Sequence, residues 1–142
     1  HEHLGRETGA TPDGRKAGLP FADGAGPAQG RETRGPTAAI LSTTRWDHSP
    51  LIGGVAFNMK FSASLFNRSP AAAGALRDLV LTFLRRGGFE MQVNVVDRTV
   101  LCKAQKNPEA YHDLVVRIGG YTDYFTRLSR EMQNEVMMRT EY

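Results

Sequence analysis

The chain has 142 residues, of which 40% are hydrophobic and 23% are charged. This length allows one domain with a hydrophobic core, and no apolar run approaches the roughly 20 residues that a membrane-spanning helix needs. The net charge is +3. The basic residues are scattered along the chain and aromatic residues do not interleave with them, which argues against a nucleic-acid-binding surface.

Three further features concern compartment and metals. No signal peptide opens the sequence, which predicts a cytoplasmic protein, and His1 stands in place of an initiator Met, which favours a fragment, a processed chain or a trimmed one. Cys102 is the single cysteine, so an internal disulfide and a cysteine-based metal site are both excluded. The histidines have no metal-ligand spacing beyond the terminal pair, and we expect them in exposed loops; they are His1, His3, His48 and His112.

Residues 1–36 are dense in Gly and Pro and have neither the helical nor the strand hydrophobic period. They predict an extended, turn-rich segment. Leu19, Phe21 and the nearby Ile40 give this segment apolar anchors, so we favour a segment that docks onto another surface over a disordered leader.

Residues 37–142 predict an α/β unit. A helix or a strand is possible over 37–46, and 53–61 alternate as a strand does. Ser69 and Pro70 predict the start of the clearest helix, which Gly87 and Gly88 end. This helix carries one apolar stripe, formed by Leu76, Leu79, Val80, Phe83 and Leu84.

The remaining elements continue this alternation. Residues 89–95 predict a strand with one apolar face, 99–105 a short helical turn, and 114–118 a second apolar strand. Ser129 predicts the cap of a last helix. This order is typical of a parallel sheet or barrel, and because two or three strands cannot close a barrel, we expect the chain to complete a larger one.

Several separate stretches carry a common signature. They are GATPDGR at 9–15, GPTA at 35–38, NMKF at 58–61, QVNVV at 92–96, AQKNPE at 104–109, RIGGYTDYF at 117–125 and QNEVMMRT at 133–140. In order and spacing they resemble the C-terminal region of glycyl radical enzymes, over nearly the whole chain. That family includes pyruvate formate-lyase, glycerol and diol dehydratases and choline trimethylamine-lyase.

The resemblance implies that Gly120 carries a backbone radical. An α-carbon radical is stabilised by the amide nitrogen on one side and the carbonyl on the other, and it must flatten, which a side chain would hinder. Arg117, three residues earlier, and Tyr121, directly after, set the register and exclude Gly119, where the family usually has Ala, Ser or Cys. By the same resemblance the residues that support the radical loop are Arg117, Gly119, Tyr121, Gln133 and Arg139.

The family's fold and partners follow from the same resemblance. It implies an α/β fold that is the C-terminal portion of a ten-stranded β/α barrel, with the glycyl loop at 117–125 inserted from one end. The radical is protein-based, with no bound cofactor or metal, and a radical S-adenosylmethionine activating enzyme with a 4Fe–4S cluster installs it. The glycine then oxidises a cysteine that lies outside this chain, so we expect Cys102 to be structural.

The motifs GPTA and NMKF look more like the dehydratase and lyase branch of the family than pyruvate formate-lyase. Phe57 and Met59 are candidates for the substrate pocket, with a core role as the alternative. Two roles stay open: the radical-storing part of a larger enzyme, or a spare part that restores an oxygen-damaged one. A basic α/β binding module is a third alternative, for which the sequence has no positive motif.

Overall fold

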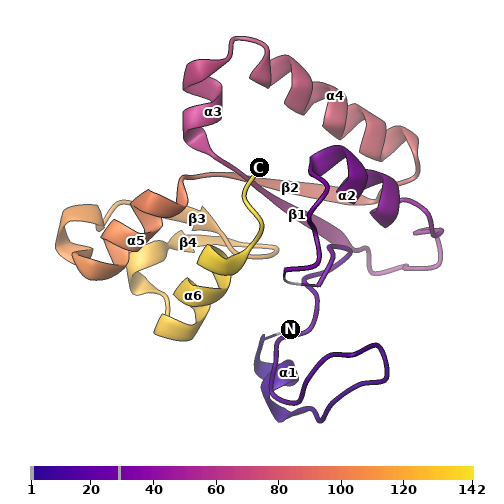
Figure 1. Ribbon diagram of the computed structural model, residues 1–142, viewed down its shortest axis with the longest axis horizontal. Helices are drawn as coiled ribbons and strands as arrows, with labels where there is room; N and C mark the ends of the chain where they lie inside the picture. Colours follow the sequence, from indigo (N-terminus) through magenta and orange to yellow (C-terminus); the bar gives the residue numbers. More distant parts are fainter. Residues whose placement is uncertain (1, 29) are drawn as a thin grey trace.

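The computed structural model describes residues 2–28 and 30–142, so that His1 and Gln29 lie outside the described residues. The elements in chain order are α1 (Glu2–Glu7), α2 (Pro36–Thr43), β1 (Ala56–Phe61), α3 (Ala63–Arg68), α4 (Ala72–Arg85), β2 (Glu90–Val95), α5 (Arg98–Lys106), η1 (Pro108–Tyr111), β3 (Val115–Arg117), β4 (Thr122–Tyr124), η2 (Phe125–Arg127) and α6 (Arg130–Met138). Figure 1 shows β1 and β2 in the middle, between α2, α3 and α4 on one side and α5, α6 and the β3–β4 hairpin on the other. The α/β organisation is confirmed.

The central pair, β1 and β2, is parallel, with Ala56 opposite Glu90 and Phe61 opposite Val95. Helices α3 and α4 form the crossover that a parallel pair requires. The other edge of β1 pairs with two segments, because Gly24 forms an antiparallel bridge to Phe57 and Glu141 a parallel bridge to Lys60. A stretch of the N-terminal segment and the C-terminal tail therefore both pair with β1.

The third predicted strand does not join this sheet. β3 pairs with β4 in an antiparallel hairpin of its own. The prediction of a continuous parallel arrangement is right for β1 and β2 and wrong for β3. Gly119 and Gly120 allow a tight turn, so β3 pairs with the residues that immediately follow it.

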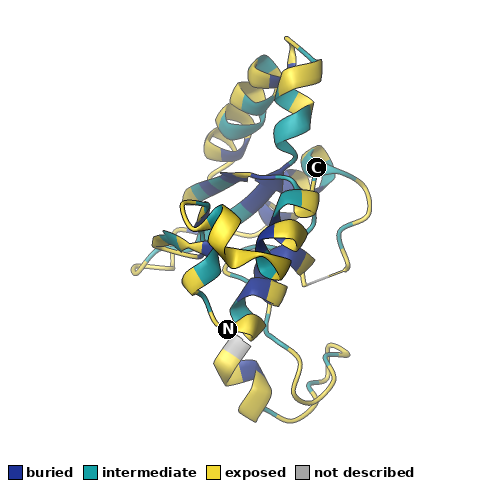
Figure 2. Ribbon diagram, turned by 90° about the vertical axis from the view of Figure 1, so that its left-hand side faces the viewer, coloured by how far each residue is buried: buried dark blue, intermediate teal, exposed yellow. Residues whose placement is uncertain are grey.

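Two separate clusters of buried side chains form the core, visible as the dark blue segments in Figure 2. The first lies between β1 and the helices α2 and α4, and contains Ala39, Ile40, Phe57, Met59, Phe61 and Phe83. The second lies under the hairpin between α5 and α6, and contains Val96, Leu101, Ala104, Val116, Ile118, Phe125, Val136 and Met137. The hairpin and the central pair thus rest on different cores.

The clearest predicted helix, α4, begins at Ala72 rather than at Ser69. The Ser69 N–H donates to the Leu65 carbonyl at 3.1 Å and so closes α3, a short helix that the sequence pattern did not predict. Phe83 of the apolar stripe is fully buried, while Leu84 is 48% exposed. Within this chain the stripe is only partly covered.

Both faces of β2 are covered, not only the apolar face that was predicted. Met91 and Val93 on the apolar face pack against the first core cluster, although Phe89 and Val95 are 53% and 48% exposed. Gln92 and Asn94 on the polar face are only 8% and 9% exposed. The reason is that the polar face of β2 lies against the hairpin, whose backbone supplies hydrogen-bond partners for both amides.

The N-terminal segment contains α1, which was not predicted, followed by turns. The Arg15 guanidinium organises these turns by donating to the carbonyls of Leu19, at 2.7 Å, and Gly5, at 3.3 Å. Further along, the Ala25 N–H donates to the Ala56 carbonyl at 2.9 Å and joins this segment to β1. Leu19, an expected anchor, is 51% exposed in this chain.

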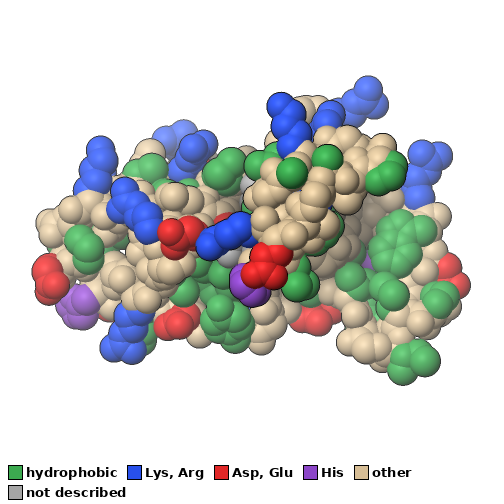
Figure 3. All heavy atoms as spheres, turned by 90° about the horizontal axis from the view of Figure 1, so that it is seen from below, with side chains coloured by type: hydrophobic (Ala, Val, Ile, Leu, Met, Phe, Trp, Pro, Cys, Tyr) green, Lys and Arg blue, Asp and Glu red, His purple; other side chains and the backbone are tan. Residues whose placement is uncertain are grey.

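His48 corrects the expectation of exposed histidines. It is 2% exposed, its Nε2 lies 2.9 Å from the Thr43 carbonyl, and its ring stacks on Trp46. Among residues 2–28 and 30–142, no three His, Cys, Asp or Glu side chains gather as a metal site. None of the helices described is long and apolar enough to cross a membrane. On the face in Figure 3, basic side chains are spread out rather than joined into one patch.

Candidate functional site

The β3–β4 hairpin places Gly119 and Gly120 at its tip. The Ile118 N–H donates to the Tyr121 carbonyl at 2.9 Å, which closes a two-residue loop. Gly120 has a φ of +80°, the value that a type II turn requires at its third position, and Gly119 is not in this left-handed region. Gly120 is therefore a glycine for a conformational reason in addition to any chemical one.

The surroundings of the two glycines differ. No atom beyond its chain neighbours lies within 4 Å of the position that a Cβ on Gly120 would occupy. A Cβ on Gly119 would be in ordinary contact with the side chains of Asn58 and Asp23, at 3.8 Å from each. Both glycines are exposed in this chain, and the side chain of Tyr121 is half-exposed. The tip of the hairpin therefore has one glycine beside Asn58 and Asp23 and the other open at its Cβ position.

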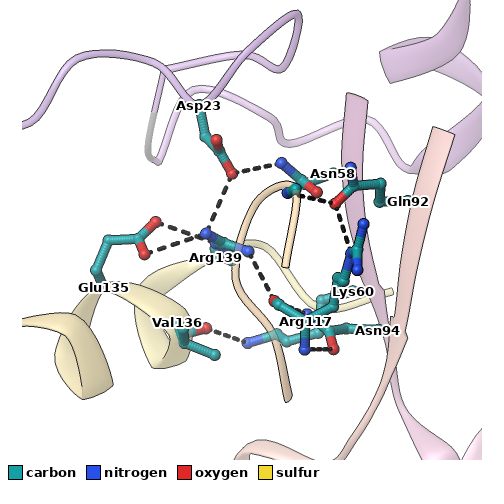
Figure 4. A network of polar contacts seen from close by, with 10 residues as sticks. Asp23, Asn58, Lys60, Gln92, Asn94, Arg117, Glu135, Val136 and Arg139 are labelled. Carbon is teal, nitrogen blue, oxygen red and sulfur yellow. Dashed lines mark hydrogen bonds and ion pairs between the residues drawn. The ribbon is translucent and has the colours of Figure 1, made fainter. Parts of the chain in front are cut away.

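Gln92 and Asn94 on β2 hold the hairpin, as the close-up in Figure 4 shows. Asn94 imitates a strand partner, because its Nδ2 donates to the Arg117 carbonyl at 2.6 Å and its Oδ1 accepts from the Arg117 N–H at 2.7 Å. The Gln92 Oε1 accepts from the Gly120 N–H at 3.1 Å. Neither amide was among the predicted site residues, although the alternation of polar residues along 90–94 was a usable signal.

Arg117 braces the hairpin from within. Its Nε donates to the Gln92 Oε1 at 2.9 Å and its Nη1 to the Thr122 Oγ1 at 3.3 Å. Since Gln92 also accepts from Gly120, one carbonyl oxygen joins the guanidinium to the amide of the turn. Arg117 and Gly120, both predicted site residues, are therefore linked through Gln92, which was not predicted as one.

Arg139 lies where α6 ends and faces the same hairpin. Its guanidinium forms a two-point ion pair with Glu135, at 3.0 Å and 3.1 Å, and a further ion pair with Asp23 at 3.2 Å. Its Nη1 donates to the Arg117 carbonyl at 3.4 Å. The Asp23 carboxylate also accepts from the Asn58 Nδ2 at 2.8 Å. Arg139 therefore links α6, the N-terminal segment and β3.

Gln133 acts on the other end of the hairpin. It is 7% exposed, and its Nε2 donates to the carbonyls of Phe125 and Leu128, at 3.0 Å and 3.2 Å. These carbonyls belong to the turn between β4 and α6. Ser129 caps α6 as predicted, since its Oγ accepts from the Met132 N–H at 3.2 Å. Gln133 and Ser129 together fix how α6 follows the hairpin.

Lys60 on β1 is a buried ammonium group that the sequence pattern did not single out. Its side chain is 0% exposed, its Nζ donates to the Met137 carbonyl at 3.2 Å, and it lies 3.6 Å from the Glu141 carboxylate. Burial lowers the pKa of Lys60 from its ordinary value, an effect that Glu141 opposes. Burial has the opposite effect on an acid, and it raises the pKa of Tyr142, an effect that the negative charge of Glu32 increases.

Three other expected residues lie away from the hairpin tip. Phe57 and Met59 are 1% and 3% exposed and pack in the first core cluster, so within this chain they have the core role rather than an open substrate pocket. Cys102 lies on α5 rather than in a turn and is exposed, with its Sγ 3.9 Å from the Met137 sulfur. Helix α5 lies at the end of the hairpin that is away from its glycine tip, as Figure 1 shows.

Comparisons with known proteins give this site its context. Residues 21–126 match the family model described as "Glycine radical". The chain is 40% identical to trans-4-hydroxy-L-proline dehydratase of Clostridioides difficile over 99% of its length, and 39% identical to the 4-hydroxyphenylacetate decarboxylase glycyl radical subunit of C. difficile strain CD196 over 100%. It superposes on the B12-independent glycerol dehydratase of Clostridium butyricum with a TM-score of 0.92 at 43% identity over 99% of the chain. It spans 18%, 16% and 18% of these three proteins, respectively.

Proposed function

The chain belongs to the glycyl radical family, and we propose that it stores the unpaired electron of a glycyl radical enzyme on the α-carbon of Gly120. The observation that carries this proposal is the placement of Gly120 at the exposed tip of a tight turn, with open space beside its α-carbon. A hydrogen atom can be removed there without moving the core. The neighbouring amide and carbonyl then share the unpaired electron.

The chemistry divides between this chain and its partners. A radical S-adenosylmethionine activating enzyme, with a 4Fe–4S cluster, takes one hydrogen atom from the Gly120 α-carbon. The Gly120 radical in turn takes a hydrogen atom from the thiol of a cysteine outside the chain, which regenerates glycine and leaves the radical on sulfur. Cys102 does not fit that role, because it lies on the exposed side of α5.

The residues around the hairpin support storage by holding the loop in one conformation. Asn94 and Arg139 both contact the Arg117 carbonyl, and Gln133 fixes the turn after β4. We propose that Arg117, Gly119, Tyr121, Gln133 and Arg139 support the radical loop. The open tip then enters the remainder of a β/α barrel, where the cysteine and the small-molecule substrate meet it.

For the reaction we propose cleavage of a C–O, C–N or C–C bond, as in the dehydratases and lyases. The similarity to a hydroxyproline dehydratase and a glycerol dehydratase supports this class. A decarboxylase subunit is nearly as similar, at 39% identity, so this region alone distinguishes the reactions weakly. The reducing cytoplasm suits both the lone thiol and an iron–sulfur activating enzyme.

The alternative role is that of a spare part that replaces an oxygen-damaged glycyl segment. The observation that favours it is that the chain has two hydrophobic core clusters made of its own residues. The two roles differ in a direct experiment. A spare part should restore activity to a large partner that has been cleaved at its own glycine, whereas a part of one enzyme should not.

Electron paramagnetic resonance tests the central proposal. The protein is activated without oxygen, together with its large partner and activating enzyme, and should give a glycine-centred signal. Gly120→Ala should give none, and Gly74→Ala on α4, where a Cβ meets no atom within 4 Å, serves as the matched control that keeps the signal. A signal of equal strength from the Gly120→Ala protein would show that the radical resides elsewhere.

A further inference from the structure

The Gln92 side chain joins the amide of Gly120 to the central strand pair. It lies in the middle of β2, is 8% exposed, and its Oε1 accepts from both the Gly120 N–H and the Arg117 Nε. The Gln92 Nε2 donates to the Glu90 carboxylate at 2.5 Å. These partners leave one orientation of the amide, because a flipped amide would point its NH₂ group at two donors.

We infer that Gln92 is a positioning residue that sets both the geometry and the spin distribution of a radical on Gly120. This inference rests on the proposed function of Gly120. The α-carbon radical draws electron density from the amide nitrogen, and an acceptor on that N–H increases the density that the nitrogen can donate. A neutral amide oxygen achieves this without placing a negative charge beside the radical.

The same contact restrains the plane of the peptide that precedes the radical carbon. Delocalisation requires the peptide groups on both sides of the Gly120 α-carbon to lie close to the plane of the radical centre. In the unactivated turn the φ of +80° sets the preceding peptide almost perpendicular to that plane, so this peptide must turn when the radical forms. The Ile118–Tyr121 bond, which also closes the turn, does not involve the Gly120 amide. Gln92 therefore limits how far the preceding peptide turns, and with it how much spin the amide nitrogen receives.

Asn94, two residues further along β2, has a different task. Both of its hydrogen bonds go to the backbone of Arg117, as a neighbouring strand would provide. It fixes β3, while Gln92 fixes the turn. Glu90, on the same face of β2, in turn orients Gln92. Of the three polar residues on this face of β2, the middle one, Gln92, therefore contacts the glycine, and Glu90 and Asn94 hold its surroundings in place.

Two variants separate positioning from simple packing. Gln92→Met keeps the length of the side chain but removes the acceptor, and Gln92→Glu keeps an acceptor and makes it anionic. The enzyme, activated without oxygen with ¹⁵N-labelled glycine, is examined by electron–nuclear double resonance. We expect Gln92→Met to change the hyperfine couplings of the Gly120 nitrogen and amide hydrogen, and Gln92→Glu to restore a coupling to a hydrogen-bonded amide hydrogen. Gln105→Met, the same change on α5, is the control and should leave the couplings as they are.

A second measurement does not depend on the radical. In the unactivated protein, hydrogen exchange of the hairpin peptide should be about fivefold faster in Gln92→Met, the factor that an ordinary net hydrogen bond provides. Unchanged couplings and unchanged exchange in Gln92→Met would overturn the role of Gln92. Absence of any glycine-centred signal in the unaltered protein would instead overturn the proposed function of Gly120, so the two failures are distinguishable.

Discussion

The side chain of Arg139 reaches the backbone carbonyl of Arg117, so the end of α6 touches the strand that leads to the glycine turn. Arg139 is also paired with Glu135 and Asp23, which lie on α6 and on the N-terminal segment. A single guanidinium therefore connects three parts of the chain that are distant in sequence. Its five donors in a planar fork suit this arrangement, which a lysine cannot reproduce.

Removal of this guanidinium should destabilise the protein. The Arg139 side chain is 10% exposed and that of Glu135 only 3%, so Arg139→Met breaks a buried ion pair. We expect a loss of about 3–5 kcal/mol in the free energy of unfolding, measured by urea denaturation, and a smaller loss for Arg139→Lys. The matched control is Arg77→Met on α4, whose partner Asp78 is 64% exposed and whose loss should stay below about 1 kcal/mol. Equal losses for both variants would contradict the buried role of Arg139.

The two glycines of the turn should respond in opposite ways to alanine. Gly120 has a φ of +80°, so Gly120→Ala should lower the free energy of unfolding by about 1–2 kcal/mol. Gly119 lacks this conformation and has only ordinary contacts at its Cβ position. Gly119→Ala should therefore raise the free energy of unfolding by about 0.4–1 kcal/mol, because alanine makes the unfolded chain less flexible. Thermal denaturation of both variants compares them. A stabilising Gly120→Ala would show that the turn differs from the one described.

That Gly119 and Gly120 break the chain after a strand was predictable, because the strand and the glycine pair lie in one short stretch. Arg117, Gly120 and Tyr121 are close in sequence, and the fold keeps that order in a tight hairpin. Strand β1 and helix α4 were likewise predicted, because a local hydrophobic period of two or of 3.6 residues is sufficient to identify them. Only the ends differed, as Ser69 closes α3 instead of opening α4.

The support of the loop was not predictable in the same way. Along residues 89–95 the apolar positions predicted one covered face, and Met91 and Val93 do pack against the first core cluster, but Gln92 and Asn94 on the other face are buried as well. Their partners are backbone groups of a hairpin that begins some twenty residues later, and no local pattern shows that contact. The burial of Lys60 was not predictable for the same reason, because its hydrogen-bond partners are carbonyls at the end of α6. Long-range polar contacts, rather than hydrophobic period, determine these positions.

Air should cut the activated protein at one place. Oxygen adds to a carbon-centred radical on Gly120 and leads to cleavage of the backbone there. Mass spectrometry after brief exposure should find two fragments whose boundary is Gly120. The same protein without activation, and the Gly120→Ala variant, should stay intact. Loss of the paramagnetic signal with an uncut chain, or a cut at another residue, would place the radical elsewhere.

The buried ammonium of Lys60 should make stability depend on pH. Burial lowers the pKa of Lys60 below its ordinary value of 10.5, so the unfolded chain binds more protons than the folded one in the window just below that value. The free energy of unfolding that Lys60 contributes should therefore rise with pH through this window. The measured quantity is the difference in the free energy of unfolding between the unaltered protein and Lys60→Met, which should grow as the pH rises toward 10.5.

This difference also removes the effect of other titrating groups, such as Tyr142, because they are present in both proteins. Lys103→Met on α5, which removes an exposed lysine, is the matched control measured in the same way. A difference for Lys60 that is constant or falls with pH would mean that Glu141 and the carbonyls of Val136 and Met137 fully offset the loss of hydration. The contacts of the ammonium group would then stabilise the folded chain by at least as much as its burial destabilises it.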